Sequence, residues 1–276
     1  MPELPEVETV RRALEPVLTG RRLVRVEIAD SRLVRPLEPL QVAAELEGER
    51  VAAVERRGKY LIVRFESARS LLIHLRMTGS LRHAPAGTLA DDPHRRAVVR
   101  LDDGSDVAYR DVRRFGTWLV LEPGELAPYL AMRLGPEPLG PLTAARLAAR
   151  FARRRAPIKA VLLDQRTLAG VGNIYADEAL WYAGVHPLRP AAGLDGEEAA
   201  RVHRSVRRVL RAGIERQGAS LRDYVQLDGA GGTMQDEFRA YGREGEPCDR
   251  CGAPIEKIRI AGRGTWYCPH CQPSPG

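Results

Sequence analysis

Four cysteines near the end of the chain constrain its fold more than any other feature of the sequence. They form two Cys-x-x-Cys pairs, Cys248 with Cys251 and Cys268 with Cys271, and sixteen residues separate the pairs. This spacing is typical of a four-cysteine zinc site, and four thiolates leave the metal no open position. Disulfides are the alternative, which an intracellular location disfavours. We therefore predict one structural zinc ion per chain.

The residues between the two cysteine pairs have the pattern of a β-hairpin. Apolar residues recur in Ile255–Ile260 and in Thr265–Tyr267, on either side of Gly262, Arg263 and Gly264. Glycines flanking a short polar segment favour a turn. We expect Arg263 at an exposed hairpin tip.

The first residues carry a different chemistry. Met1 precedes a small residue, so its removal would expose Pro2 as a secondary amine. An α-amino group has a pKa of about 7.7–8.0, so part of it is neutral and nucleophilic at pH 7. Its attack on an aldehyde-like carbon would give an iminium ion, and Glu3 is placed for proton transfer. The alternative is that Pro2 and Glu3 only start a helix, where proline and acidic residues are favoured.

The 276 residues suffice for two domains of different class. Apolar residues recur at helical spacing over 5–18, and short β-like segments follow from residue 22 to 121, with a hairpin signal at 102–104. Beyond a proline- and glycine-rich linker the pattern is helical. We predict an α+β multidomain chain: a helix and antiparallel β-sandwich in 1–134, a linker at 135–141, a helical domain in 142–246 and a zinc finger in 247–276.

The charge of the chain favours a polyanionic partner. The formal net charge is +7 and the pI about 9.5, and arginine supplies nearly all the positive charge, so that Lys59, Lys159 and Lys257 are the only lysines. The sequence has no run of 18 apolar residues and no basic, apolar N-terminal signal. We expect a cytoplasmic, nucleoid-associated protein without a membrane span.

Two segments of the β region combine arginine, glycine and an apolar side chain. One is 74–79, which contains His74 and Met77, and the other is 111–116, which contains Arg113, Arg114 and Phe115. Core packing is the ordinary role of such apolar side chains. Apolar wedges beside arginines are also what proteins insert into a DNA stack. A third polar segment, 91–96, contains His94, which could contact phosphate or be solvated.

These motifs together resemble the bacterial formamidopyrimidine-DNA glycosylases from end to end. The resemblance rests on PELPEVE at the start, HLRMTG and RRFG in the β region, DQRTLAGVGNIYADEALW and YGREGEPC in the helical region, and GRGTWYCPHC at the finger. It implies a β-sandwich domain, a helix-two-turn-helix domain and a zinc finger, with DNA bound between them. It also implies a monomeric glycosylase and abasic-site lyase that removes oxidised purines, such as 8-oxoguanine and formamidopyrimidines, from double-stranded DNA.

The resemblance assigns roles to particular residues. Pro2 would attack C1′ of the damaged nucleotide, Glu3 would be the acid–base group, Lys59 would serve β-elimination and Arg263 δ-elimination. Met77, Arg113 and Phe115 would fill the gap left by the extruded base. The DNA contacts implied by the family are His74, His94, Arg113, Arg114, Arg154, Lys159 and Asn173.

Two alternatives remain at the level of sequence. The first is an endonuclease VIII-like enzyme for oxidised pyrimidines, which shares the implied fold. It stays open because the segment 228–234, where the family recognises the lesion, is unusually rich in glycine. A non-catalytic, zinc-dependent DNA-binding protein is the second alternative, against which the intact Pro2, Glu3 and Lys59 argue.

Overall fold

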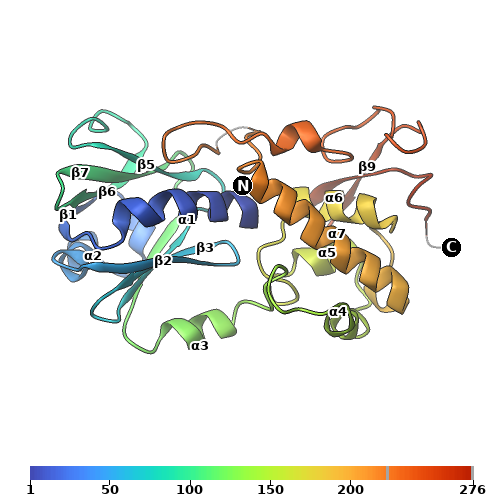
Figure 1. Cartoon of the computed structure of the whole chain (residues 1–276), viewed down its shortest axis with the longest axis horizontal. Helices are drawn as coiled ribbons and strands as arrows, with labels where there is room; N and C mark the ends of the chain where they lie inside the picture. The colour runs from blue at the N-terminus through green and yellow to red at the C-terminus, as the bar shows by residue number, and fades with distance from the viewer. Residues whose placement is uncertain (222–223, 275–276) are drawn as a thin grey trace. The chain divides into compact units, whose positions relative to one another are not determined.

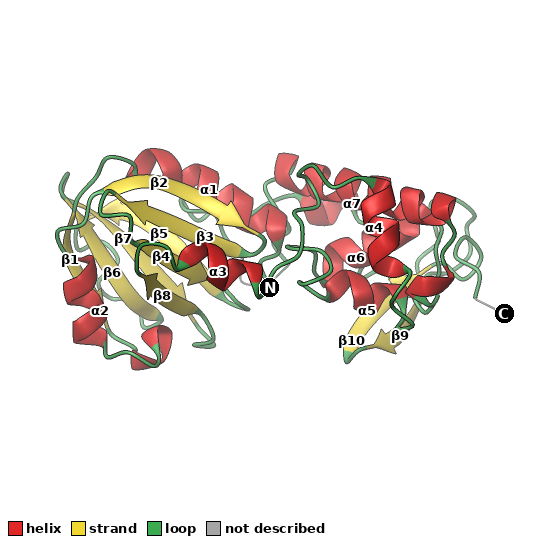
Figure 2. Cartoon of the chain, turned by 90° about the horizontal axis from the view of Figure 1, so that it is seen from below, coloured by secondary structure: helices red, strands yellow, loops and turns green. Residues whose placement is uncertain are grey.

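The computed structural model describes residues 1–221 and 224–274. The chain forms two compact units, Met1–Ala131 with Arg216–Thr233, and Met132–Glu215 with Met234–Gly276. Strands dominate the first unit and helices the second (Figure 1, Figure 2). The segment Arg216–Thr233 packs with the β-rich unit, whereas the sequence pattern groups it with the helical domain. Residues 222–223 and 275–276, which fall within two of the predicted domains, lie outside the described residues.

The first unit is the predicted antiparallel β-sandwich. One sheet has the strand order β1-β6-β7-β5 and the other the order β2-β3-β4-β8. Strands β3, β4 and β7 are largely buried, whereas β1 and β2 intersperse buried positions, which face the core between the sheets, with exposed ones. Their bounds are β1 Leu23–Ile28, β2 Val51–Arg57, β3 Tyr60–Phe65, β4 Ser70–His74, β5 Gly79–Pro85, β6 Arg95–Leu101, β7 Ser105–Asp111 and β8 Thr117–Leu121.

Three α-helices accompany the sandwich: α1 Leu4–Leu18, α2 Pro39–Leu46 and α3 Leu126–Ala131, with a 3-10 turn at Ser31–Val34. Helix α1 buries Val7, Val10 and Leu14 in the core of the sandwich, at the spacing that predicted the helix. The sequence pattern did not predict β5, α2 or α3, because each is short or only partly periodic.

The second unit contains the helices α4 Ala144–Phe151, α5 Ile158–Leu163, α6 Asn173–Ala183 and α7 Gly196–Glu215, with 3-10 turns at Ala191–Gly193 and Met234–Glu237. Thr143 caps α4, since its side chain accepts a hydrogen bond from the Arg146 amide. Among the described residues, no helix has both the length and the apolar character that crossing a bilayer requires.

A β-hairpin, β9 Glu256–Ile260 and β10 Arg263–Tyr267, completes the second unit. Ile260 pairs with Arg263, so the turn consists of Ala261 and Gly262, both with positive φ. This geometry suits a two-residue turn that follows the twist of the strands. The sequence analysis therefore placed the turn too far toward the C-terminus, at Gly262–Gly264. The exposed Arg263 is the first residue of β10, beside the turn.

Candidate functional site

The strand register gathers the predicted site residues of the first unit at one end of the sandwich. Tyr60 pairs with His74, and His74 with Thr117, so β3, β4 and β8 share one end. In the other sheet, Gly79 pairs with Asp111. The turn before β3 and the loops that join β4 to β5 and β7 to β8 therefore lie together, although along the chain they are spread over residues 58–116.

Helix α1 places the N-terminus of the chain at this same end. Its Glu8 accepts a hydrogen bond from Arg56 Nε at 3.0 Å, and farther along the helix Arg11 reaches the carbonyl of Val54 at 3.5 Å. The helix thus runs antiparallel to β2, and its first turn lies toward the end of that strand. Arg56 also donates to the carbonyl of Gly58 at 3.0 Å, which ties the helix to the β2–β3 turn.

Pro2 and Glu3 are buried at the start of α1, and the Glu3 side chain is 2% exposed. Glu3 is the N-cap, and its backbone amide donates to Glu6 Oε2 at 2.8 Å in a capping box. The other oxygen of Glu6 accepts from the Ala219 amide at 2.9 Å. The helix start proposed as the alternative role is present, and it holds the residues next to the N-terminal amine in a fixed geometry.

Lys59 occupies the second position of a two-residue turn between β2 and β3. Gly58 precedes it with a φ of 58°, as such a turn requires at its first position. The Lys59 side chain is buried at 6% exposure, near His74. Burial, with the charges of Arg76 and Lys59, lowers the pKa of His74 to about 3. His74 is therefore neutral at pH 7, its Nδ1 accepts from the Arg76 amide at 3.0 Å, and its DNA contact stays a prediction.

The predicted wedge residues lie on the two loops that join the sheets. Phe115 is 52% exposed, which excludes core packing for its ring, and the Arg113 guanidinium lies 4.9 Å from the ring centroid. Met77 is half-buried on the neighbouring loop. Arg114 instead forms an ion pair with Asp30, and its hydrogen bond lowers the pKa of that carboxyl.

His94 joins this end of the sandwich from the loop before β6. Its carbonyl accepts from the Asp111 amide at 3.0 Å, and its half-buried ring has Nδ1 3.4 Å from Arg96 Nη2. The ring is therefore partly accessible beside the wedge loops. Its contact with phosphate stays a prediction.

In the second unit, a buried polar network attaches the β9–β10 hairpin to helices α5 and α6. Lys159 is 0% exposed. Its Nζ donates to Gly264 O at 2.9 Å and to Thr265 Oγ1 at 2.7 Å, and it forms an ion pair with Asp177 Oδ1 at 2.7 Å. Asn173 donates to the same Gly264 carbonyl at 3.0 Å. The ammonium of Lys159 is enclosed by these acceptors, and its phosphate contact stays a prediction.

Arg154 follows α4 and is the better phosphate candidate in the helical region. Its side chain is 42% exposed and donates to Asp164 at 2.8 Å. The network around Lys159 holds Gly264, so the neighbouring Arg263 stands on a fixed hairpin and not on a loose loop. Arg263 itself is exposed.

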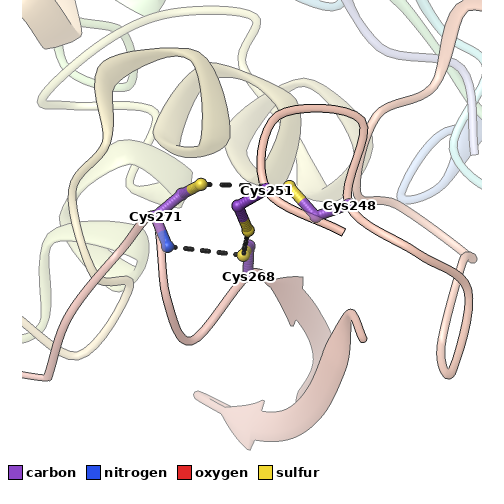
Figure 3. Close-up of side chains that lie close together, drawn as sticks. All are labelled: Cys248, Cys251, Cys268 and Cys271. Carbon is purple, nitrogen blue, oxygen red and sulfur yellow. Dashed lines mark hydrogen bonds between the residues drawn. The ribbon is translucent and has the colours of Figure 1, made fainter. Parts of the chain in front are cut away.

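The four cysteines converge as the spacing predicts (Figure 3). Their sulfur atoms all lie within 4.8 Å of one another, with 3.5 Å between Cys251 and Cys268 and 4.0 Å between Cys248 and Cys271. Sulfurs on a tetrahedral zinc ion with Zn–S bonds of about 2.3 Å would be roughly 3.8 Å apart. Disulfide sulfurs would be about 2.05 Å apart. The donor set fits one structural zinc ion, which these four residues would hold.

The zinc centre supports a direct prediction. Each chain should carry one zinc ion, and its removal by a chelator should weaken DNA binding, because the finger presents Arg263, and should leave borohydride trapping at saturating DNA in place. Metal analysis, titration of DNA and trapping of the same sample check this. Protein that is purified without zinc and with its thiols paired as disulfides would contradict the assignment.

Two acidic residues that organise the second unit carried no recognisable signal in the sequence. Glu178 is wholly buried in α6 and accepts from the amides of Arg239, Ala240 and Tyr241, each at 2.9 Å. Asp177 beside it faces Lys159. Adjacent acids within a helix are ordinarily solvated, and only the near absence of lysine pointed toward Lys159 as an unusual residue.

Models of known families match nearly the whole chain. Residues 1–118 match the formamidopyrimidine-DNA glycosylase N-terminal domain, residues 134–225 the formamidopyrimidine-DNA glycosylase H2TH domain, and residues 245–273 a zinc finger found in FPG and IleRS.

Individual relatives match over nearly all of this chain and at least nine-tenths of their own length. The formamidopyrimidine-DNA glycosylase of Symbiobacterium thermophilum is 49% identical over 100% of this chain and 90% of its own length, and that of Herpetosiphon aurantiacus is 46% identical over 99% and 100%.

Solved structures agree with the fold. Lactococcus lactis Fpg in complex with DNA containing an abasic site has a TM-score of 0.92 at 38% identity, covering 99% of this chain and 100% of that one. MutM bound to DNA containing carbocyclic 8-oxo-G matches with the same TM-score, identity and coverage. Sequence, domain order and fold agree throughout, and the chain belongs to the formamidopyrimidine-DNA glycosylase family.

Proposed function

We propose that this chain excises oxidised purines, such as 8-oxoguanine and formamidopyrimidines, from double-stranded DNA and then cleaves the strand. The observation that carries this proposal is the convergence, at one end of the sandwich, of the α1 start with Pro2 and Glu3, the Lys59 turn and the loops of Met77 and Phe115. A reactive amine, an acid and an exposed aromatic wedge at one place are what such chemistry requires, because a base inside the duplex must be extruded before it can be attacked.

In this proposal the Pro2 amine, freed of Met1, attacks C1′ of the extruded nucleotide. The new N–C1′ bond replaces the glycosidic bond, and the base leaves with the electron pair and a proton. Glu3 assists by proton transfer at the sugar. The amine then loses its one proton, and the sugar ring opens as the C1′–O4′ bond breaks and O4′ takes up a proton. The product is an iminium ion with a fixed positive charge, since its nitrogen carries no proton that could be lost.

The iminium ion acidifies the C2′ hydrogen and so promotes strand cleavage. Loss of that proton breaks the C3′–O bond and releases the 3′ phosphate, and a second elimination releases the 5′ phosphate. We assign Lys59 to the first elimination and Arg263 to the second. The zinc ion, held by four cysteines, supplies only the stability of the finger that carries Arg263.

The proposal is tested with a duplex that contains 8-oxoguanine opposite cytosine, in the presence of borohydride. We expect base release, strand cleavage and a covalent protein–DNA adduct. Wild-type protein that binds this duplex but yields neither free base nor adduct would overturn the proposal and leave the DNA-binding alternative.

Arg113 should read the base that remains opposite the gap. Its guanidinium can donate two hydrogen bonds to O2 and N3 of an orphaned cytosine, whereas adenine offers no such paired acceptors. A bidentate contact discriminates by about 1–3 kcal/mol, so wild-type excision should be roughly ten- to a hundredfold faster opposite cytosine than opposite adenine. In single-turnover assays, Arg113→Ala should lower this ratio.

The matched control for this experiment is Arg114→Ala. The Arg114 guanidinium is engaged by Asp30, so its removal should leave the cytosine-to-adenine ratio unchanged. An unchanged ratio in Arg113→Ala as well would show that Arg113 is not the reader of the opposite base.

Binding should depend steeply on salt, because phosphate contacts release counterions. Removal of one phosphate contact reduces the slope of log affinity against log salt by about one. We expect this for Arg154→Ala, measured by titration at several salt concentrations. Arg69→Ala is the matched control: like Arg154, Arg69 pairs with a carboxylate, Glu122 at 3.0 Å, but it lies at the far end of β4, away from the predicted site. Equal slopes in Arg154→Ala and wild type would remove Arg154 from the interface.

We further propose that the protein acts as a monomer in the cytoplasm and associates with the nucleoid. In this proposal residues 1–134 form the catalytic domain, 142–246 the DNA-binding domain with the lesion-recognition loop, and 247–276 the finger, with 135–141 as linker. The three family-model matches support this division.

A further inference from the structure

The two loops that carry the wedge are linked by a buried carboxylate. Asp111 ends β7 and is 1% exposed. Its Oδ1 accepts from the hydroxyl of Thr78 and, at 3.2 Å, from the amide of Arg113, while its Oδ2 accepts from the amide of Gly116 at 2.8 Å. Thr78, on the other loop, also accepts from the Arg113 amide at 3.0 Å.

Close packing beneath the loops reinforces this link. The hydroxyl of Tyr109 lies against both Gly79 and Gly116, and a Cβ at either glycine would overlap it. Both loops therefore pack against the buried ring of Tyr109. The backbone of Asp111 extends the link, because its amide donates to His94 O at 3.0 Å and its carbonyl accepts from Arg96 Nε at 2.9 Å.

The side chains between these anchors are exposed. Phe115 is 52% exposed and Val112 38%, whereas Asp111 and Thr78 beneath them are buried. Packing alone would not require a buried, ionisable side chain that accepts three hydrogen bonds from two loops. Fixing loops in advance removes the ordering cost that binding would otherwise carry.

We propose that the Asp111 carboxylate, with the Thr78 hydroxyl, is a positioning device that holds Met77, Arg113 and Phe115 as one preformed wedge. Asp111 touches no nucleotide in this role. It sets the backbone of both loops so that the three side chains enter the DNA stack together. The inference rests on the proposed function, because it concerns the extrusion step of that reaction.

Three variants separate this role from ordinary structural support. Asp111→Asn keeps the shape of the side chain but replaces one acceptor oxygen by a donor. Thr78→Val removes the hydroxyl at nearly constant shape, and Thr78→Ser restores it. We measure single-turnover excision of 8-oxoguanine opposite cytosine, and strand scission at a preformed abasic site in the same sequence, where no stacked base has to be displaced.

We expect excision to fall about tenfold in Asp111→Asn and Thr78→Val, the effect of losing a hydrogen bond to a charged group. Scission at the abasic site should stay within about twofold of wild type, and Thr78→Ser should recover excision. In a Phe115→Ala background, Asp111→Asn should add little, because residues that act through one another are not additive.

The outcomes distinguish this inference from the proposed function. Wild-type protein without excision or adduct would refute the function itself. Active wild type with unimpaired excision in both Asp111→Asn and Thr78→Val would refute only the positioning role. The positioning role would also be refuted if the loss of excision in Asp111→Asn were as large in the Phe115→Ala background as in wild type. It would be refuted too if the variants reduced scission at the abasic site as much as they reduce excision. If Asp111→Asn does not fold, Thr78→Val and Thr78→Ser decide the matter.

Discussion

A variant that keeps residues ahead of Pro2 should form no borohydride-trapped adduct with DNA and should release no base. An amine that is acylated by a preceding residue has no basic lone pair, so it cannot attack C1′. Removal of the nucleophile abolishes the covalent route, which makes this the largest effect expected on activity. The measurement is trapping on an abasic-site duplex by wild-type protein processed at Met1 and by protein with a short N-terminal extension.

The control must show that the extended protein is intact, because Pro2 is buried at the start of α1. Its zinc content, thermal unfolding and affinity for a duplex with a non-cleavable abasic analogue should match those of the processed protein. Peptide mapping of the wild-type adduct should place the DNA on the N-terminal peptide. An adduct on the peptide of Lys59 would instead make that lysine the nucleophile.

The elements that the sequence predicts well are those whose pattern is local. The periodicity of Val7, Val10 and Leu14 defines α1, the cysteine spacing defines the zinc site, and the Asp102–Gly104 turn defines the β6–β7 hairpin. Each signal lies within one stretch of chain. The sequence pattern did not predict strand β5, because its first residues look like the continuation of a polar loop.

The geometry of the site depends on contacts between distant residues, which a single sequence does not display. No local pattern indicates that Thr78 and Asp111 meet, since this follows from the pairing of Gly79 with Asp111 across two strands. The same limitation explains why the burial of Lys159 is not evident from the sequence. A lone lysine in an arginine-rich chain suggests a special role, but its burial depends on Asp177 and on the hairpin of Thr265.

Lys159→Met should destabilise the second unit by about 3–5 kcal/mol, because it leaves a buried carboxylate without its counter-charge. Lys159 and Asp177 are both 0% exposed and lie 2.7 Å apart. The hydrogen bonds of Lys159 to Gly264 and Thr265 are lost in the same variant. Denaturant unfolding at pH 8, followed by circular dichroism and by the exposure of the cysteine thiols, measures the loss.

The loss should also depend on pH, in a direction that Asp177 sets. Burial raises the pKa of Asp177 above its ordinary value, and the Lys159 ammonium opposes that shift, so the pKa should rise further in Lys159→Met. A carboxyl whose pKa is higher in the folded than in the unfolded state stabilises the fold at low pH, and this contribution disappears as the pH rises through the folded pKa. Lys159→Met should therefore be closer to wild type at pH 5 than at pH 8.

The double variant Lys159→Met with Asp177→Asn is the matched control, because it removes both charges at similar volume. Its own stability should vary less between pH 5 and pH 8 than that of Lys159→Met, because it has no Asp177 carboxyl to titrate, and it should be more stable than Lys159→Met at pH 8. If Lys159→Met instead unfolds like wild type at pH 8, the ammonium is not what holds the hairpin of Arg263 on its helices. A reduced salt slope of DNA binding in that stable variant would then support Lys159 as a phosphate contact.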